Sequence, residues 1–319
     1  MRTLVVGAGA TGGYFGARLA EAGADVTFLV RPGRAERLAA DGLSIKSPLG
    51  DLHLPAPATV TADRLAAAGA FDLVLLSCKA YDLAAAVDDL APALGEGTAI
   101  LPVLNGLSHL DALDARFGAE RVLGGSCAIA ATLTREGTIR HMSELCSITY
   151  GERDGTRSAR IAAVDALMRG ADGTAPTFQA RLSDRIVQEM WEKWVFLATL
   201  AGATTLMRAA IGDIVAAPGG RDFIAALHAE CTAVAAASGH APREKVAAGA
   251  LAQLTAEGST FTASMLRDIE GRGRIEADHI VGDLIARGRR LAPETGLPVL
   301  DRVYTGLKAY EARRAREDA

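Results

Sequence analysis

The sequence predicts an α/β domain followed by an all-helical domain. In the first half of the 319 residues, apolar runs typical of buried strands alternate with segments of helical spacing. A glycine-rich turn joins the first expected strand to the first expected helix. From Ser183 onward, strand-like runs disappear and long helical patterns follow one another. We therefore expect a doubly wound sheet in residues 1–183 and a helical domain in residues 184–319.

The individual elements follow from the spacing of apolar residues. In the first domain the expected strands are mostly continuous apolar runs, as in a parallel sheet covered on both faces. These strands are Leu4–Val6, Val26–Val30, Leu52–Leu54, Phe71–Ser77, Ala99–Leu104, Val122–Ala131, Ile139–His141 and Ser147–Tyr150. The helices expected in the second domain are Asp184–Ala201, Gly220–Ser238, Ala241–Ala256, Ala263–Ile269, Glu276–Arg289 and Pro298–Arg316.

The turn after the first strand has the spacing G-x-G-x-x-G, with Gly7, Gly9 and Gly12. In a dinucleotide site the first glycine allows the tight turn and the second lets the backbone approach the pyrophosphate. The third lets the helix pack closely on the sheet. The helix N-terminus then offers N–H groups to the phosphates. We expect Gly7, Gly9, Ala10, Thr11 and Gly12 to bind a dinucleotide; the alternative is a glycine-rich turn without a ligand.

The residue after the second strand indicates which dinucleotide binds. Sites for NAD place a carboxylate at this strand end to accept from the ribose 2′-hydroxyl, whereas Asp25 stands at the other end. Arg31 follows the strand directly, and its guanidinium suits a 2′-phosphate. We therefore expect NADP(H), with Arg31 as the main contact and Arg34 as support. The alternative is that Arg31 is only a solvated residue.

Composition excludes several other classes of function. A net charge of −4 and a pI near 5.9 give no basic surface for nucleic acid. The weakly polar run Trp194–Met207 is too short to span a membrane, and no signal peptide is visible. The four cysteines are widely spread without metal-ligand spacing, so we expect no metal and a reducing, cytoplasmic location. The apolar helical domain could support a homodimer.

Polar residues after two other strands are candidate ligand contacts. Lys79 lies two residues past Phe71–Ser77, and Asn105 comes directly after Ala99–Leu104. Ligands of open α/β sheets bind beyond the carboxyl ends of the strands, so both residues are expected at the cofactor rim. Either could equally be an ordinary polar residue at a strand end.

Lys193 stands within an apolar helix face, together with Ile186, Met190 and Leu197. A lysine there is costly unless it meets a partner, lines a cavity or extends to the surface. An ammonium beside a ketone could stabilise and protonate the alkoxide that hydride transfer creates. Glu276 at a helix start and Ser264 at another are unremarkable by position alone, because acidic residues and serine favour helix N-termini.

Taken in order, these segments resemble the ketopantoate reductase (2-dehydropantoate 2-reductase) family over nearly the whole chain. The similar segments are GAGATG from Gly7, Arg31, CKAYD at Lys79, LNG at Asn105, WEKW at Lys193, SMLRDIEGRGRIEAD from Ser264, and GLPVLDRVY from Gly296. The resemblance implies a Rossmann domain and a helical domain of the 6-phosphogluconate dehydrogenase C-terminal type, with the active site in the cleft between them.

The resemblance also implies roles for the candidate residues. Lys193 would be the general acid at the substrate carbonyl, and Glu276 would hydrogen-bond the substrate and position Lys193. Asn105 would lie between nicotinamide and substrate, Lys79 near the cofactor, and Ser264 at the substrate carboxylate.

The sequence departs from the family pattern where the substrate binds. Family members usually carry asparagines one and two turns after the catalytic lysine, and here Leu197 and Ala201 occupy those positions. A further asparagine expected before the serine motif is replaced by the Phe261–Thr262 region. Without these amides a hydroxylated substrate loses hydrogen bonds, so the resemblance implies a less polar pocket.

The sequence thus predicts NADPH-dependent reduction of a 2-oxo acid, most simply ketopantoate to pantoate in pantothenate biosynthesis. One alternative is a related enzyme that reduces a less polar 2-oxo acid or oxidises a hydroxy acid. Another is a non-catalytic NADP(H)-binding sensor, which would need neither Lys193 nor Glu276.

Overall fold

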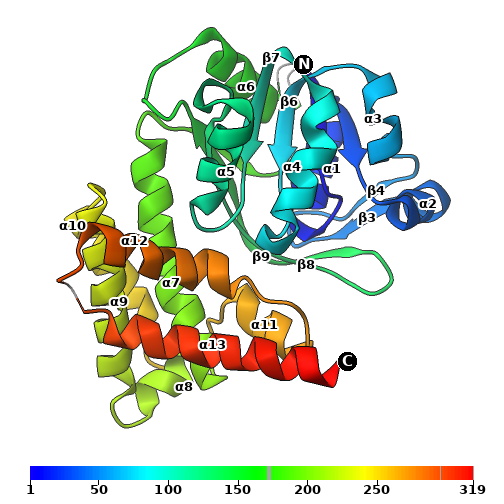
Figure 1. The fold of residues 1–319 in the computed structure, drawn as a ribbon. Coiled ribbons are helices and arrows are strands. Elements are labelled where there is room, and N and C mark those ends of the chain that lie inside the picture. The colour runs from blue at the N-terminus through cyan, green and yellow to red at the C-terminus, as the bar shows by residue number, and fades with distance from the viewer. Residues whose placement is uncertain (171–173, 295, 319) are drawn as a thin grey trace. The chain divides into compact units, whose positions relative to one another are not determined.

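The computed structural model describes residues 1–170, 174–294 and 296–318. The chain forms two compact units (Figure 1). The first, which we call the Rossmann unit, comprises Met1–Leu104 and His109–Val187. The second, the helical unit, comprises Gln188–Ala319 together with the short segment Asn105–Ser108.

A parallel sheet forms the centre of the Rossmann unit, with strand order β5-β2-β1-β6-β7. Its strands are β1 (Arg2–Val6), β2 (Asp25–Leu29), β5 (Thr59–Val60), β6 (Phe71–Leu76) and β7 (Leu94–Pro102). The helices of this part of the chain are α1 (Ala10–Glu21), α2 (Pro32–Asp41), α3 (Ala62–Ala68), α4 (Leu83–Leu90), α5 (Ser108–Phe117) and α6 (Ala159–Arg169). The expected α/β fold with a Rossmann domain and a helical domain is confirmed.

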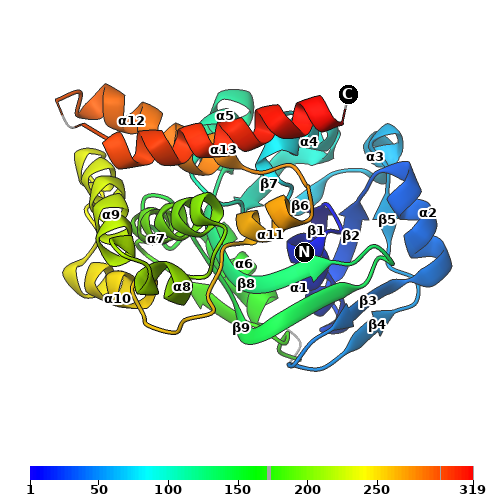
Figure 2. The ribbon, with the colours of Figure 1, turned by 90° about the horizontal axis from the view of Figure 1, so that it is seen from below.

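A second, mixed sheet lies beside the parallel one, and Figure 2 shows β8 and β9 next to β3 and β4. It consists of β3 (Leu43–Lys46), β4 (Leu52–Leu54), β8 (Gly124–Leu133), β9 (Ile139–Gly151) and β10 (Gln179–Leu182). The expectation of one doubly wound sheet that includes Val122–Ala131 is therefore wrong. The two short strands expected at Ile139–His141 and Ser147–Tyr150 are one strand, β9, and β10 was not expected.

The chain changes sheets at two glycines. Val122 still pairs in parallel with Ile100 of β7, as expected for the next strand of the first sheet. From Gly124 onward the chain instead pairs antiparallel with β9. At Gly125 a Cβ atom would lie 2.1 Å from the carbonyl oxygen of Pro102, so the backbone there runs directly against the end of β7. Antiparallel pairing with β9, the next strand along the chain, places β8 in the second sheet, and apolar spacing does not encode this choice.

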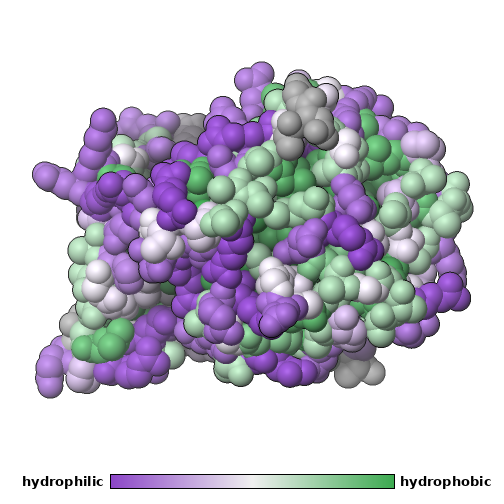
Figure 3. Space-filling view, turned by 90° about the horizontal axis from the view of Figure 1, so that it is seen from above, coloured by the Kyte–Doolittle hydropathy of each residue, from purple (hydrophilic) through white to green (hydrophobic). Residues whose placement is uncertain are grey.

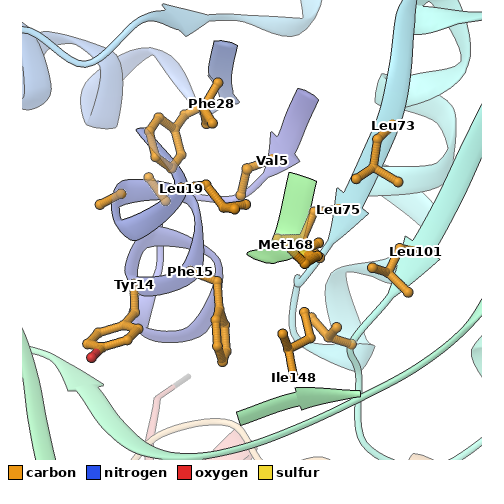
Figure 4. Packing of buried hydrophobic residues seen from close by; sticks show 14 of the residues in the cluster. Val5, Tyr14, Phe15, Leu19, Phe28, Leu73, Leu75, Leu101, Ile148 and Met168 are labelled. Carbon is orange, nitrogen blue, oxygen red and sulfur yellow. The ribbon is translucent and has the colours of Figure 1, made fainter. Parts of the chain in front are cut away.

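Helix α1 lies between the two sheets and shares a core with both. Leu19 lies beside Val5 and Phe28 of the parallel sheet in Figure 4. Phe15 points toward Ile148 of β9, and all of these side chains are at most 1% exposed. Because α1 follows the glycine turn directly, this packing fixes the position of the helix N-terminus beside that turn.

The helical unit is built around α9. Its helices are α7 (Ile186–Met207), α8 (Ile211–Ala216), α9 (Gly220–Ala237), α10 (Glu244–Leu254), α11 (Ser264–Glu270), the π-helical turn η4 (Asp278–Gly282), α12 (Asp283–Leu291) and α13 (Pro298–Glu317). Helix α8 was not expected, and the helix expected at Glu276–Arg289 is interrupted by η4. A Cβ at Gly202 of α7 would lie 3.0 Å from Val303 of α13 and 3.1 Å from Leu227 of α9. These three helices therefore pack closely.

Acidic pH is expected to destabilise the helical unit through His228 of α9. This side chain is 7% exposed, and its Nε2 has no hydrogen-bond partner within the described part of the chain. Burial lowers the pKa of His228 below its ordinary value of 6.5. The unfolded state then binds more protons between the two pKa values. The contribution of neutral His228 is complete above pH 6.5 and is lost as the pH falls below that value.

Urea unfolding at several pH values between 7.5 and 5 checks this expectation. The free energy of unfolding should fall toward pH 5, and the slope should be smaller in His228→Leu. An unchanged slope in that variant would contradict the assignment. Glu192, whose pKa is lowered from 4.5 because the hydrogen bonds from Arg243 outweigh the effect of burial, acts only at lower pH.

None of the described helices is long and apolar enough to cross a membrane. Hydrophilic residues are spread among apolar ones over the face drawn in Figure 3.

Candidate active site

Glycine stands at the three positions of the first turn for three different physical reasons. Gly7 has φ +94°, a value that favours glycine, and its N–H donates to the carbonyl of Leu29 at 3.0 Å. At Gly12 a Cβ would lie 2.0 Å from Oγ of Ser77 and 2.4 Å from the carbonyl oxygen of Gly7. Gly9, the N-cap of α1, has φ −87°, and a Cβ there would meet no protein atom within 4 Å.

The open space at Gly9 is the observation that fits a bound nucleotide. Neither backbone strain nor a protein neighbour requires glycine at that position. The helix that follows begins with Ala10 and Thr11, whose N–H groups belong to the unpaired first turn. A pyrophosphate held against these N–H groups would come close to the backbone of Gly9, and an added methyl group would obstruct it.

We expect Gly9→Ala to weaken NADPH binding about tenfold, equivalent to about 1.4 kcal/mol, without lowering thermal stability. Fluorescence titration and a melting curve measure the two quantities. The matched control is Gly249→Ala in α10, where a Cβ would also meet no neighbour within 4 Å. That variant should leave binding unchanged. Equal nucleotide affinity in Gly9→Ala and the control would contradict a phosphate site at this turn.

Arg31 stands at the carboxyl end of β2 and is the N-cap of α2. Its side chain is 78% exposed, and Nη2 lies 3.2 Å from Oδ1 of Asp82, which follows β6. Asp25 lies at the opposite end of β2, with Oδ2 3.8 Å from Nε of Arg2. The exposed guanidinium of Arg31 is therefore available at the expected strand end, but an anionic side chain already competes for it.

Arg34, which we expected to support Arg31, contacts backbone carbonyl oxygens of the Rossmann unit. Its Nη2 donates to the carbonyl oxygens of Ala8 and Gly137, each at 3.3 Å. The side chain is half-buried, and burial lowers the pKa of its guanidinium. Since Ala8 lies inside the glycine turn, Arg34 ties this turn to the β8–β9 connection. No sequence pattern indicates this contact, because Gly137 is 103 residues away from Arg34.

Lys79 is the third candidate nucleotide contact of the Rossmann unit. It caps the short 3-10 turn η1 (Ala80–Asp82), three residues after β6 ends. Strands β2 and β6 flank β1 in the sheet. The glycine turn, Arg31 and Lys79 thus follow three adjacent parallel strands at the same edge, where ligands of such sheets bind.

Lys193 lies in α7 and is half-buried. The helix is fixed on both sides of it. Glu192, 6% exposed, accepts from Nε and Nη2 of Arg243 at 2.8 and 2.6 Å. Trp194, 1% exposed, donates from Nε1 to the carbonyl of Ile280 in η4 at 2.9 Å. These contacts restrict the position of the Lys193 backbone.

Glu276 and Asn105 belong to the same unit as Lys193. Glu276 is 7% exposed and stands immediately before the turn that leads into η4. Asn105 is half-buried and follows β7 in sequence, yet it groups with the helical unit. Its backbone forms a hydrogen bond with the ring of His279, one helical turn after Glu276. Lys193, Glu276 and Asn105 are thus carried by segments that contact one another around His279 and Ile280.

Ser264 begins α11, and the preceding Ala263 donates its N–H to Oγ1 of Thr204 in α7 at 3.3 Å. Thr204 shares the helix face of Lys193, about three turns further on. On the same face Leu197 is half-buried, whereas Ala201 is fully buried. Phe261, 44% exposed, lies 6.0 Å from Phe196 between ring centroids. Only Leu197 of the two substituted positions is therefore accessible to a ligand.

Sequence reasoning did not identify His279 or Ser108. Oγ of Ser108 lies 2.7 Å from Nδ1 of His279. The spacing of His279 three residues after Glu276 placed both on one helix face and could have indicated it. Nothing in the sequence pairs it with Ser108, since 171 residues separate them.

The parallel sheet and its glycine turn define a dinucleotide-binding Rossmann protein, and comparisons with known proteins identify the family. Residues 3–155 match the family described as ketopantoate reductase PanE/ApbA, and residues 185–311 match its C-terminal domain. The chain belongs to the ketopantoate reductase family, whose members are nicotinamide-dependent oxidoreductases.

Similar proteins cover nearly all of the chain. It is 37% identical to an uncharacterized oxidoreductase, YkpB, of Bacillus subtilis (strain 168), over 98% of this chain and 100% of the relative. It is 30% identical to a 2-dehydropantoate 2-reductase of Mesorhizobium japonicum, over 98% and 99%. The crystal structure of 2-dehydropantoate 2-reductase from Geobacter metallireducens GS-15 has a TM-score of 0.86 at 29% identity, covering 97% of this chain and 99% of that one.

Proposed function

We propose that this protein is an NADPH-dependent reductase of a 2-oxo acid, most simply of ketopantoate to pantoate in pantothenate biosynthesis. Residues 1–183 would form the NADP-binding domain and residues 184–319 the catalytic domain of a cytoplasmic enzyme. The observation that carries the proposal is the presence of Lys193, Glu276 and Asn105 on mutually contacting segments of one compact unit. A protein that only binds the nucleotide needs neither the carboxylate of Glu276 nor the amide of Asn105 near the ammonium of Lys193.

The residues of the Rossmann unit fit the cofactor. Gly7, Gly9, Ala10, Thr11 and Gly12 would hold the pyrophosphate, and Arg31 would bind the 2′-phosphate. Lys79 would lie near the cofactor. Bound NADPH supplies a hydride to the carbonyl carbon of the substrate.

The helical unit would supply the acid chemistry. The ammonium of Lys193 would hydrogen-bond the carbonyl oxygen, stabilise the negative charge that develops there and donate the proton. Glu276 would accept from the substrate hydroxyl and orient Lys193. Asn105 would position the reacting carbonyl, and Ser264 would donate to the substrate carboxylate. The oxo acid thus gains one hydride and one proton and leaves as a 2-hydroxy acid.

Oxidation of NADPH, followed at 340 nm, tests this proposal. The assay compares ketopantoate with a panel of 2-oxo acids that lack its hydroxyl. The expected result is that NADPH is oxidised in the presence of ketopantoate or of at least one 2-oxo acid of the panel. If NADPH bound but was not oxidised with any of the acids, the proposal would be contradicted. That result would favour oxidation of a hydroxy acid or a non-catalytic NADP(H)-binding sensor.

A less polar 2-oxo acid is the second candidate substrate, and Leu197 is the observation that favours it. The side chain is half-buried on the Lys193 face, where family members usually carry asparagine. Leu197→Asn is expected to raise kcat/KM for ketopantoate about tenfold relative to the unhydroxylated acid, because a substrate hydroxyl then gains a partner. The comparable change Leu251→Asn in α10 should leave the ratio unchanged. An unchanged ratio in Leu197→Asn would mean that this position does not contact substrate.

A further inference from the structure

The segment Asn105–Ser108 contacts His279 of the helical unit along its length. Gly106 has φ +74°, and a Cβ there would lie 2.8 Å from the backbone oxygen of His279 and 2.9 Å from its Cδ2. The segment therefore runs so close to His279 that a larger residue than glycine would force the two apart. These four residues belong to the helical unit, whose remaining part begins at Gln188.

Polar contacts tie both ends of the segment to the same ring. Oγ of Ser108 lies 2.7 Å from Nδ1, and the ring also hydrogen-bonds to the backbone of Asn105. Burial lowers the pKa of His279, against the opposing effects of Glu276, Asp283 and Asn105, while Arg287 adds to the lowering. A neutral imidazole has one donor and one acceptor nitrogen, which suits a backbone carbonyl at one end and a hydroxyl at the other.

The ring stands at a distorted part of its helix. His279 is the second residue of η4, the π-helical turn that starts two residues after Glu276. Such turns occur mostly as single interruptions of α-helices and are frequent at functional sites. The next residue, Ile280, accepts the hydrogen bond from Trp194, the neighbour of Lys193. The segments of Asn105, Glu276 and Lys193 thus meet at two consecutive residues.

We infer that His279 is a positioning residue, which fixes the Asn105–Ser108 segment to the helical turn that follows Glu276 and so sets where the Asn105 amide stands. This inference rests on the proposed function for the role of Asn105. The side chain itself need not touch substrate or cofactor. Its removal would leave Lys193 and Glu276 in place and free the amide that aligns the reacting carbonyl.

Hydrogen exchange of the intact protein, read by mass spectrometry on a peptide that contains Asn105–Ser108, tests the inference without turnover. His279→Phe keeps an aromatic ring and loses both hydrogen bonds. We expect exchange of this segment to rise about tenfold, with unchanged exchange in α13 and an unchanged NADPH Kd. Ser108→Ala, which loses one bond, should show a smaller rise, and His279→Gln should restore part of the protection. His240→Phe, a histidine that stacks on Trp191, is the control.

Kinetics supply the second measurement. In His279→Phe, kcat for the best 2-oxo acid should fall about tenfold or more, while KM for NADPH stays unchanged. Unchanged exchange of the segment in both His279→Phe and Ser108→Ala would overturn the inference. So would faster exchange with an unchanged kcat. Absence of turnover in the wild-type protein, with the expected exchange pattern, would instead count against the proposed function alone.

Discussion

Lys193→Met is expected to lower kcat for the 2-oxo acid by about a thousandfold, within the range that a positioned general acid contributes. Methionine keeps most of the apolar stem and removes only the ammonium. The contacts of Glu192 with Arg243 and of Trp194 with Ile280 should still hold α7 in place. The Kd of NADPH, measured by fluorescence, should therefore change less than about twofold.

The matched control for this variant is Lys245→Met, which removes an exposed lysine of α10 in the same unit. Its kcat should equal that of the wild-type protein. If Lys193→Met retained most of the activity, Lys193 could not be the proton donor. If it instead lost nucleotide binding, the ammonium would belong to the cofactor site.

Substitutions of Arg31 and of Asp82 are expected to change NADPH affinity in opposite directions. Arg31→Ala removes the proposed partner of the 2′-phosphate, and NADPH binding should weaken by roughly one to two orders of magnitude. Asp82→Asn removes the carboxylate that lies 3.2 Å from the guanidinium. A phosphate should then bind more tightly, since it no longer competes with that anion or is repelled by it.

NADH, which lacks the 2′-phosphate, serves as the internal control in both titrations. Its Kd should change little in Arg31→Ala, so that the preference between the two cofactors narrows. Equal losses for NADPH and NADH would contradict a 2′-phosphate contact. A preference of the wild-type protein for NADH would overturn the assignment of the cofactor itself.

The features that the sequence predicted correctly are set by local spacing. The glycine turn, the position of Arg31 after β2 and the helix around Lys193 each depend on residues within about two turns or one strand of one another. The apolar spacing that distinguishes strands from helices is also local. Its change along the chain therefore predicted an α/β domain followed by a helical domain.

The features that were missed depend on which partners each segment meets in the fold. Strand β8 has the apolar character of a strand in the first sheet, but its antiparallel partner β9 places it in the second. The contact of Arg34 with the carbonyl of Gly137 joins residues 103 positions apart. Ser108 and His279 have no recognisable pattern without each other. The contacts of Arg34 and of Ser108 join residues too far apart for any periodic signal, whereas β8 and β9 are neighbours in sequence whose choice of sheet apolar spacing does not encode.

Deuterium transfer tests the central claim most directly. NADPH carrying deuterium at both C4 positions is incubated with the protein and ketopantoate or the best unhydroxylated 2-oxo acid, and the product is examined by mass spectrometry and NMR. We expect a 2-hydroxy acid with one deuterium on C2 for each NADPH oxidised. A product without deuterium at C2, or no product while NADPH remains bound, would contradict it.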